Sequence, residues 1–106
     1  MEIVKDVYLL TEDIPEKEKF GLISQTTRAA VSIPSNIAEG SGRGTNKDTK
    51  RFFEIALGSA FELETQLLII QDIFLSKNDL LDKLLKKINE EQKMLNGFIQ
   101  KLKTNN

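Results

Sequence analysis

The sequence predicts an all-α protein built as an antiparallel four-helix bundle. Apolar residues recur three or four positions apart in four segments, which is the period of one face of an α-helix. No segment shows the strict alternation of apolar and polar residues that is typical of a β-strand. Short stretches of turn-forming residues separate the segments, and short connections favour antiparallel neighbours with axes crossing at about 20°.

The first two helices are expected on either side of a turn at Pro15. The first is short and covers residues 2–12, with apolar positions at Ile3, Val4, Val7 and Leu10. Pro15 then restrains the residue before it. The second covers residues 16–39, about 36 Å of helix, with an apolar face at Leu22, Thr26, Ala30, Ile33 and Ile37. Pro34 lies in its interior and predicts a kink near Ala30, since proline crowds the carbonyl four residues earlier.

The third helix is expected after a glycine-rich turn. Gly40 suits a left-handed helix cap, and Thr45 with Asp48 has the spacing of a capping box. The apolar seam of this helix has the spacing of a heptad repeat and consists of Phe53, Ala56, Ala60, Leu63, Leu67, Ile70 and Phe74. Leu57, Phe61 and Leu68 widen the apolar face beyond what one core contact needs. A second surface must therefore cover it.

The fourth helix is expected after a second capping pattern at Ser76 and Asp79. Its seam consists of Leu81, Leu84, Ile88, Leu95, Phe98 and Leu102. Glu91 occupies a position where the seam favours an apolar residue. Either Met94 and Leu95 cover this gap in the seam or Glu91 faces a polar partner, and the first interpretation is favoured. Residues 104–106 have nothing to pack against and are expected to fray.

Composition limits the possible chemistry. A chain of 106 residues, 40% apolar and 29% charged, predicts a single folded domain over residues 1–106. No apolar run is long enough to span a bilayer and no leader is recognised, so a cytoplasmic protein without membrane contact is expected. The absence of Cys and His excludes thiol and imidazole catalysis and ordinary zinc or di-iron sites. We therefore expect a protein that is not an enzyme and carries neither cofactor nor metal.

A basic segment follows the glycines and is the best candidate for binding a charged partner. Its cations are Arg43, Lys47, Lys50 and Arg51. With Asp48 they give this segment a charge of +3, which leaves −4 on the remainder of a chain whose net charge is −1. Glycines and the following helix N-terminus suit a phosphate, although the spacing is neither a P-loop nor a dinucleotide fingerprint. In one subunit, a solvated loop with ordinary surface charges is slightly favoured over a binding site, whereas an oligomer would sum the fields of several such loops. The neighbouring Phe52 and Phe53 are expected in the core.

The second helix contains a polar motif of Ser32, Pro34, Asn36 and Glu39. The favoured interpretation is structural: serine or asparagine donors satisfy the carbonyl that the proline frees. Arg28 and Glu62 are expected to form a buried pair across helices that sets their register.

A carboxylate site for magnesium or manganese is the alternative for the acidic residues of these helices. Its ligands would be Glu39, Glu62 and either Glu54 or Glu64.

The order of these landmarks resembles a known family. The matching stretches are Val7-Tyr8, Phe20-Gly21-Leu22, Gln25, residues 28–40 (RAAVSIPSNIAEG), Gly42-Arg43, Arg51-Phe52-Phe53, Ala56 with Gly58-Ser59, Glu62-Leu63-Glu64 and residues 94–97 (MLNG). Over residues 4–103 the chain is similar to the four-helix-bundle proteins encoded in intervening sequences of bacterial 23S ribosomal RNA genes. Members of that family usually begin with a longer first helix that contains a Val-Trp pair, which is missing here.

The resemblance implies a left-handed up-down-up-down bundle that assembles into a small ring, commonly a pentamer. A related accessory protein of diversity-generating retroelements is basic and binds nucleic acid, whereas this chain is slightly acidic.

Three hypotheses of function follow from these observations. The first is a ring that binds RNA phosphates, ribosomal RNA among them, through Arg43, Lys47, Lys50 and Arg51, with Arg28 maintaining the fold. The second is an adaptor that binds another protein and no nucleic acid. The third is a magnesium-dependent phosphohydrolase.

Overall fold

The computed structural model describes residues 2–104, and this part of the chain contains four α-helices and no strand. The helices are α1 (Glu2–Thr11), α2 (Ser24–Ser41), α3 (Asn46–Ile73) and α4 (Asp79–Thr104). A 3-10 turn, η1 (Glu16–Glu18), and a π-helical turn, η2 (Lys19–Ile23), connect α1 to α2. The predicted all-α class is therefore confirmed. Of the residues expected to fray, Thr104 ends α4, and residues 105 and 106 lie outside the described residues.

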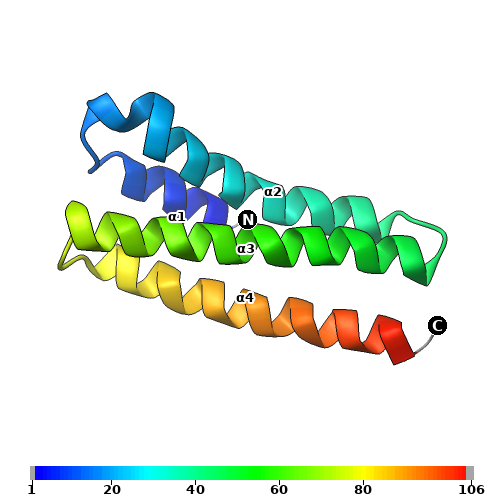
Figure 1. Cartoon of the computed structure of the whole chain (residues 1–106). Coiled ribbons are helices and arrows are strands. Elements are labelled where there is room, and N and C mark those ends of the chain that lie inside the picture. The colour runs from blue at the N-terminus through cyan, green and yellow to red at the C-terminus, as the bar shows by residue number, and fades with distance from the viewer. Residues whose placement is uncertain (1, 105–106) are drawn as a thin grey trace.

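The helices form an elongated bundle of 46 × 23 × 18 Å in which consecutive helices run in opposite directions (Figure 1). α3 packs along both α2 and α4, and α1 packs against α2 and α4, diagonally across from α3. This arrangement is consistent with the expected up-down-up-down order. The left-handed twist stays a prediction.

The core runs along the bundle axis and contains the predicted seams of α3 and α4. Every predicted α3 seam residue is buried except Phe74, which is half-buried. On α4 the buried seam consists of Leu81, Leu84, Ile88 and Leu95. The register then differs from the prediction: Ile99 is buried, whereas the Phe98 side chain is 46% exposed. Phe98 still contacts the core, because its ring meets Phe53 edge-to-face with 6.1 Å between centroids.

The bundle has four helices over only part of its length. α1 has 10 residues and α3 has 28, or about 15 Å against about 42 Å at 1.5 Å per residue. Beyond the N-terminus of α1, a groove of about 230 Å³ lies between α2 and α4, walled by Ile37 and Glu91 among others. Of the two residues expected to cover the gap at Glu91, Leu95 is buried, but the expectation is wrong for Met94, which is 52% exposed, and Glu91 is half-buried at this groove.

Two of the predicted helix ends differ from the structure. α2 continues past Gly40 to Ser41, and no described residue has a positive φ, so Gly40 is not a left-handed cap. Gly40 is required for close approach instead, because a Cβ there would lie 2.9 Å from Phe52 Cβ. At α4 the cap is Asn78 rather than Ser76, since Asn78 Oδ1 accepts the Leu81 N–H at 2.9 Å.

The predicted cap of α3 is present. Thr45 Oγ1 accepts a hydrogen bond from the backbone N–H of Asp48 at 3.1 Å. Thr45 immediately precedes Asn46, the first residue of α3. The side chain thus satisfies one of the free N–H groups of the first turn.

α2 remains one unbroken helix across Pro34. Asn36 Nδ2 donates to the Ser32 carbonyl at 2.8 Å and to Ser32 Oγ at 3.0 Å. The Ser32 hydroxyl also lies 2.8 Å from that of Ser59 on α3. Ser32 and Asn36 therefore have partners inside the bundle, although Asn36 bonds the Ser32 carbonyl and not that of Ala30. The kink near Ala30 stays a prediction.

Candidate nucleic-acid interface

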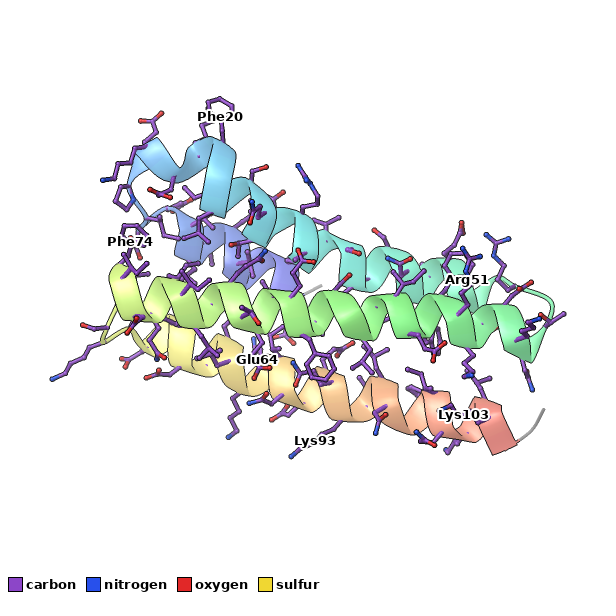
Figure 2. The ribbon with its side chains drawn as sticks, in the orientation of Figure 1. Phe20, Arg51, Glu64, Phe74, Lys93 and Lys103 are labelled. Carbon is purple, nitrogen blue, oxygen red and sulfur yellow. The ribbon has the colours of Figure 1, made fainter. Side chains whose placement is uncertain are left out.

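Two segments that are distant in the sequence meet at one end of the bundle, which we call the basic end. It consists of residues 42–51, from the turn after α2 into α3, and residues 100–104 at the end of α4. Figure 2 shows Arg51 and Lys103 at this end. Lys103 and Glu54 line one shallow depression between α3 and α4, which places the last turn of α4 beside the third turn of α3.

The basic end concentrates positive charge in a chain whose net charge is −1. The predicted cations Arg43, Lys47, Lys50 and Arg51 are joined by Lys101 and Lys103, against the single carboxylate of Asp48 in these two segments. At the opposite end, residues 12–19 and 72–83 contain seven carboxylates against four lysines. The molecule is therefore electrically polar along its long axis.

Sequence reasoning missed Lys101 and Lys103. An antiparallel α3–α4 pair joined by a short loop places the end of α4 beside the start of α3. The predicted bounds of the two helices were therefore enough to place Lys101 and Lys103 near the start of α3.

Phe52 holds two of the cations in place. The guanidinium carbon of Arg43 lies 4.6 Å from the centroid of the Phe52 ring, and that of Arg51 lies 5.5 Å away. Such cation–π contacts leave the guanidinium donors free to bind an anion. The expectation that Phe52 is core is wrong, because its ring is only half-buried beneath these two side chains, whereas Phe53 is buried as expected.

Only one of the predicted cations forms an ion pair within the part of the chain that the structure describes. Arg43 Nη2 lies 3.3 Å from Glu39 Oε1, one helical turn earlier, and both side chains are about half exposed. An exposed pair of this kind contributes about 0–1 kcal/mol. Lys47 and Arg51 are exposed and Lys50 is half-buried. Their positive charges, together with the N-terminal dipole of α3, favour an anion.

The predicted buried pair of Arg28 and Glu62 is wrong. Both residues are exposed. Arg28 Nη2 lies 3.5 Å from Ser24 Oγ on its own helix, and Glu62 Oε1 accepts a hydrogen bond from Gln66 Nε2 at 3.3 Å. Each side chain is thus paired one turn away on its own helix, where the partner is nearest.

The carboxylates of the metal alternative lie apart. Glu39 pairs with Arg43, Glu64 Oε1 accepts from Gln92 Nε2 at 3.1 Å, and Glu54 lies beside Lys103. Over residues 2–104, no three acidic side chains are close enough together to hold a metal ion.

A large apolar surface remains uncovered. The predicted second face of α3 is present, with Leu57 half-buried and Phe61 and Leu68 about half exposed. Further exposed apolar side chains are Ile55, Ile69 and Ile73 on α3, and Tyr8, Leu9, Phe20 and Val31 on α1, η2 and α2. Extended apolar patches on soluble proteins mark interaction surfaces.

No helix in the described part of the chain is both long and apolar enough to cross a membrane.

A family model described as 23S rRNA-intervening sequence protein matches residues 1–97. The match covers α1, α2, α3 and most of α4, including all four predicted cations of the basic end. No curated protein matches the chain.

Proposed function

Because the chain belongs to the 23S rRNA-intervening sequence protein family, we propose that it is a cytoplasmic, non-enzymatic protein that assembles with itself and binds structured RNA through the basic end. The observation that carries the proposal is the meeting of two separate basic segments at one end of the bundle. The family description, which names ribosomal RNA, supports RNA as the polyanion.

Recognition is directed to the phosphate backbone. Lys47 and Lys50 supply point charges beside the start of α3, and the planar guanidinium groups of Arg43 and Arg51 suit bidentate contacts with phosphate oxygens. Phe52 orders both guanidinium groups before RNA arrives, because its ring lies under both of them. Such binding weakens steeply as salt rises and reads few bases.

Self-association explains the uncovered apolar surface and strengthens the interface. The exposed apolar residues of α3 and those of α1 and α2 are different surfaces, so copies that join them repeat head to tail, and a closed ring is the proposed arrangement of that repeat. A pentamer is the proposed size. Rotation about a ring axis along the bundle places every basic end on one rim, where the fields of several copies add.

The experiment measures fluorescence anisotropy of a labelled, structured fragment of ribosomal RNA at several salt concentrations. Arg43→Glu with Lys50→Glu is expected to weaken binding at least about tenfold and to lower the salt slope by about 1 for each phosphate that is no longer neutralised. The matched control, Lys17→Glu with Lys83→Glu, makes the same change of charge at the opposite end and should leave affinity within about twofold. Equal losses in both variants, or no binding by the wild type at low salt, would contradict the proposal.

A protein-binding adaptor is the second candidate, and the exposed apolar residues of α3 favour it. Purification of a stoichiometric complex with another protein that contains no RNA would support this alternative, and a native mass equal to a multiple of the chain alone would oppose it.

A further inference from the structure

Phe20 is an aromatic side chain that its own chain leaves uncovered. It is 91% exposed, on the π-helical turn η2, and Figure 2 shows it directed away from the bundle. The ammonium group of the neighbouring Lys19 lies 5.7 Å from the centroid of its ring. Nothing in the fold requires a phenylalanine at this position, and a large exposed aromatic residue is the usual anchor of a protein interface.

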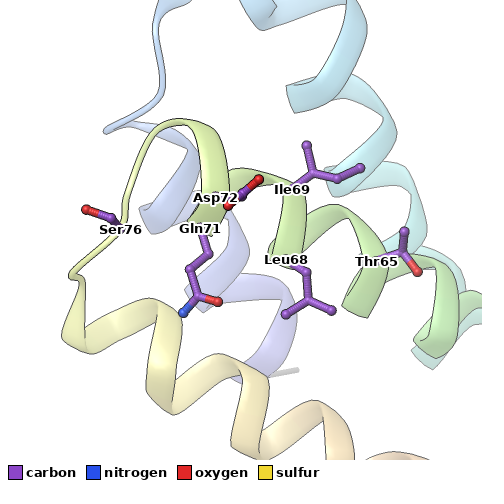
Figure 3. Close-up of a pocket in the computed structure, with 6 residues that line it drawn as sticks. All are labelled: Thr65, Leu68, Ile69, Gln71, Asp72 and Ser76. Carbon is purple, nitrogen blue, oxygen red and sulfur yellow. The ribbon is translucent and has the colours of Figure 1, made fainter.

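A depression on the outer face of α3 has the size and chemistry to receive such a side chain. It is an open hollow of about 560 Å³ lined by Thr65, Leu68, Ile69, Gln71, Asp72 and Ser76 (Figure 3). Leu68 and Ile69 are partly exposed and form its apolar wall. Asp72 is the one charged residue in this lining, so the hollow suits an apolar group that has a cation beside it.

Phe20 and this hollow lie at the same end of the bundle, opposite the basic end. Figure 2 shows Phe20 and Phe74, the residue that follows α3, at that end. Copies related by rotation about an axis along the bundle keep each residue at the same height. Phe20 of one copy, with its sequence neighbour Lys19, is then at the same end of the assembly as the α3 hollow of the next copy, whose lining includes Asp72.

We infer that Phe20 anchors the contact between neighbouring copies, with its ring in the α3 hollow of the next copy and Lys19 facing Asp72 there. The inference rests on the self-association in the proposed function and adds which surfaces meet. The contact joins two different surfaces, so each copy uses its Phe20 on one neighbour and its hollow on the other. When the rotation between copies closes a ring, every basic end lies on one rim.

The first test measures native mass against protein concentration by light scattering. Phe20→Ala is expected to weaken self-association about 30-fold or more at each interface, which is typical of the truncation of an interface anchor. The substitution leaves the fold intact because the side chain is exposed, and circular dichroism checks this. Met94→Ala, which removes an exposed apolar side chain on α4, should leave the mass unchanged. An unchanged mass for Phe20→Ala would overturn the inference and leave self-association standing.

The second test uses the absence of cysteine from the chain. Lys19→Cys and Asp72→Cys chains are co-expressed and treated with a short bismaleimide crosslinker. Crosslinked dimers that contain one chain of each kind are expected, and neither variant should crosslink efficiently by itself. Dimers of like chains in place of mixed ones would overturn the inference.

Charge reversal completes the test. Lys19→Asp and Asp72→Lys are each expected to weaken assembly, and the two changes combined in one chain should restore it, since the pair is then reversed. Additive losses would remove the ion pair from the contact. A wild type that stays a single copy at micromolar concentration would refute the proposed self-association, and this inference with it.

Discussion

Replacing Gly40 by alanine tests how the basic end is built. Gly40 is buried near the end of α2, where α3 begins to pack against it. A Cβ at this position would lie 2.9 Å from Phe52 Cβ and 3.0 Å from Phe53 Cδ1 and Cε1. Cβ atoms essentially never come so close to other atoms. Because Phe52 Cβ is fixed to the α3 backbone, the two helices must separate by several tenths of an ångström.

The expected free energy combines two opposing effects. Alanine in place of glycine inside a helix normally stabilises by about 0.5–1 kcal/mol. Overpacking by one methyl group costs about 1–3 kcal/mol. The net expectation is a destabilisation of about 1 kcal/mol, which lowers the melting temperature of a domain of this size by about 4–8 °C.

Gly97→Ala is the matched control. It makes the same substitution inside α4, where a Cβ would have no atom within 4 Å. It should therefore stabilise the protein by about 0.5–1 kcal/mol. The assay is urea unfolding followed by circular dichroism, with all variants at one protein concentration because self-association contributes to stability. Gly40→Ala at least as stable as the wild type would refute the reasoning that Gly40 is present for close packing.

Three further predictions address charge, pH and packing. Glu39→Gln frees Arg43 and should tighten RNA binding about two- to fivefold in the anisotropy assay, whereas no gain would mean that the ion pair does not compete with RNA. The Lys87 ammonium donates to Asp6 Oδ2 at 2.7 Å and to Glu2 on α1, and these hydrogen bonds raise the pKa of Lys87 above its ordinary 10.5. The contribution of charged Lys87 to the free energy of unfolding is complete below pH 10.5 and is lost as the pH rises through its folded-state pKa. Lys87→Met should therefore show a smaller decrease in the free energy of unfolding at alkaline pH than the wild type, measured by urea unfolding. Leu63→Ala, at a fully buried position, should cost about 2–5 kcal/mol in the same assay, against less than about 0.5 kcal/mol for the exposed Met94→Ala.

The elements that the sequence predicted well are those with strong periodicity. The α3 seam from Phe53 to Ile70 is buried as expected, because a residue on the inner stripe of a helix has few alternatives to the core. The Thr45 cap is also local, and its hydrogen bond spans three residues. The predictions that failed involve partners on other elements. The Arg28–Glu62 pair is one example, since spacing along two helices does not decide how the helices rotate toward each other.

The candidate interface was predictable only in part. Arg43, Lys47, Lys50 and Arg51 are close in sequence, and their proximity follows from chain connectivity. The position of Phe52 beneath two guanidinium groups depends on how α2 ends against α3 at Gly40. The heptad seam includes Phe53 and not Phe52, so the spacing already separated the buried ring from the half-buried one, and the expectation that Phe52 is core went beyond that pattern.

The amino-acid sequence alone determined the class of fold, the order of the helices, the inner stripe of α3 and that of α4 as far as Leu95, and the excess of positive charge after α2. All of these depend on periodicity and composition, which are properties of neighbouring residues. Only the tertiary structure decided that the end of α4 joins the basic end, that α1 covers part of the bundle, and that Phe20 is uncovered. These features depend on how helices of unequal length align, and that alignment is set by packing between residues far apart in the chain.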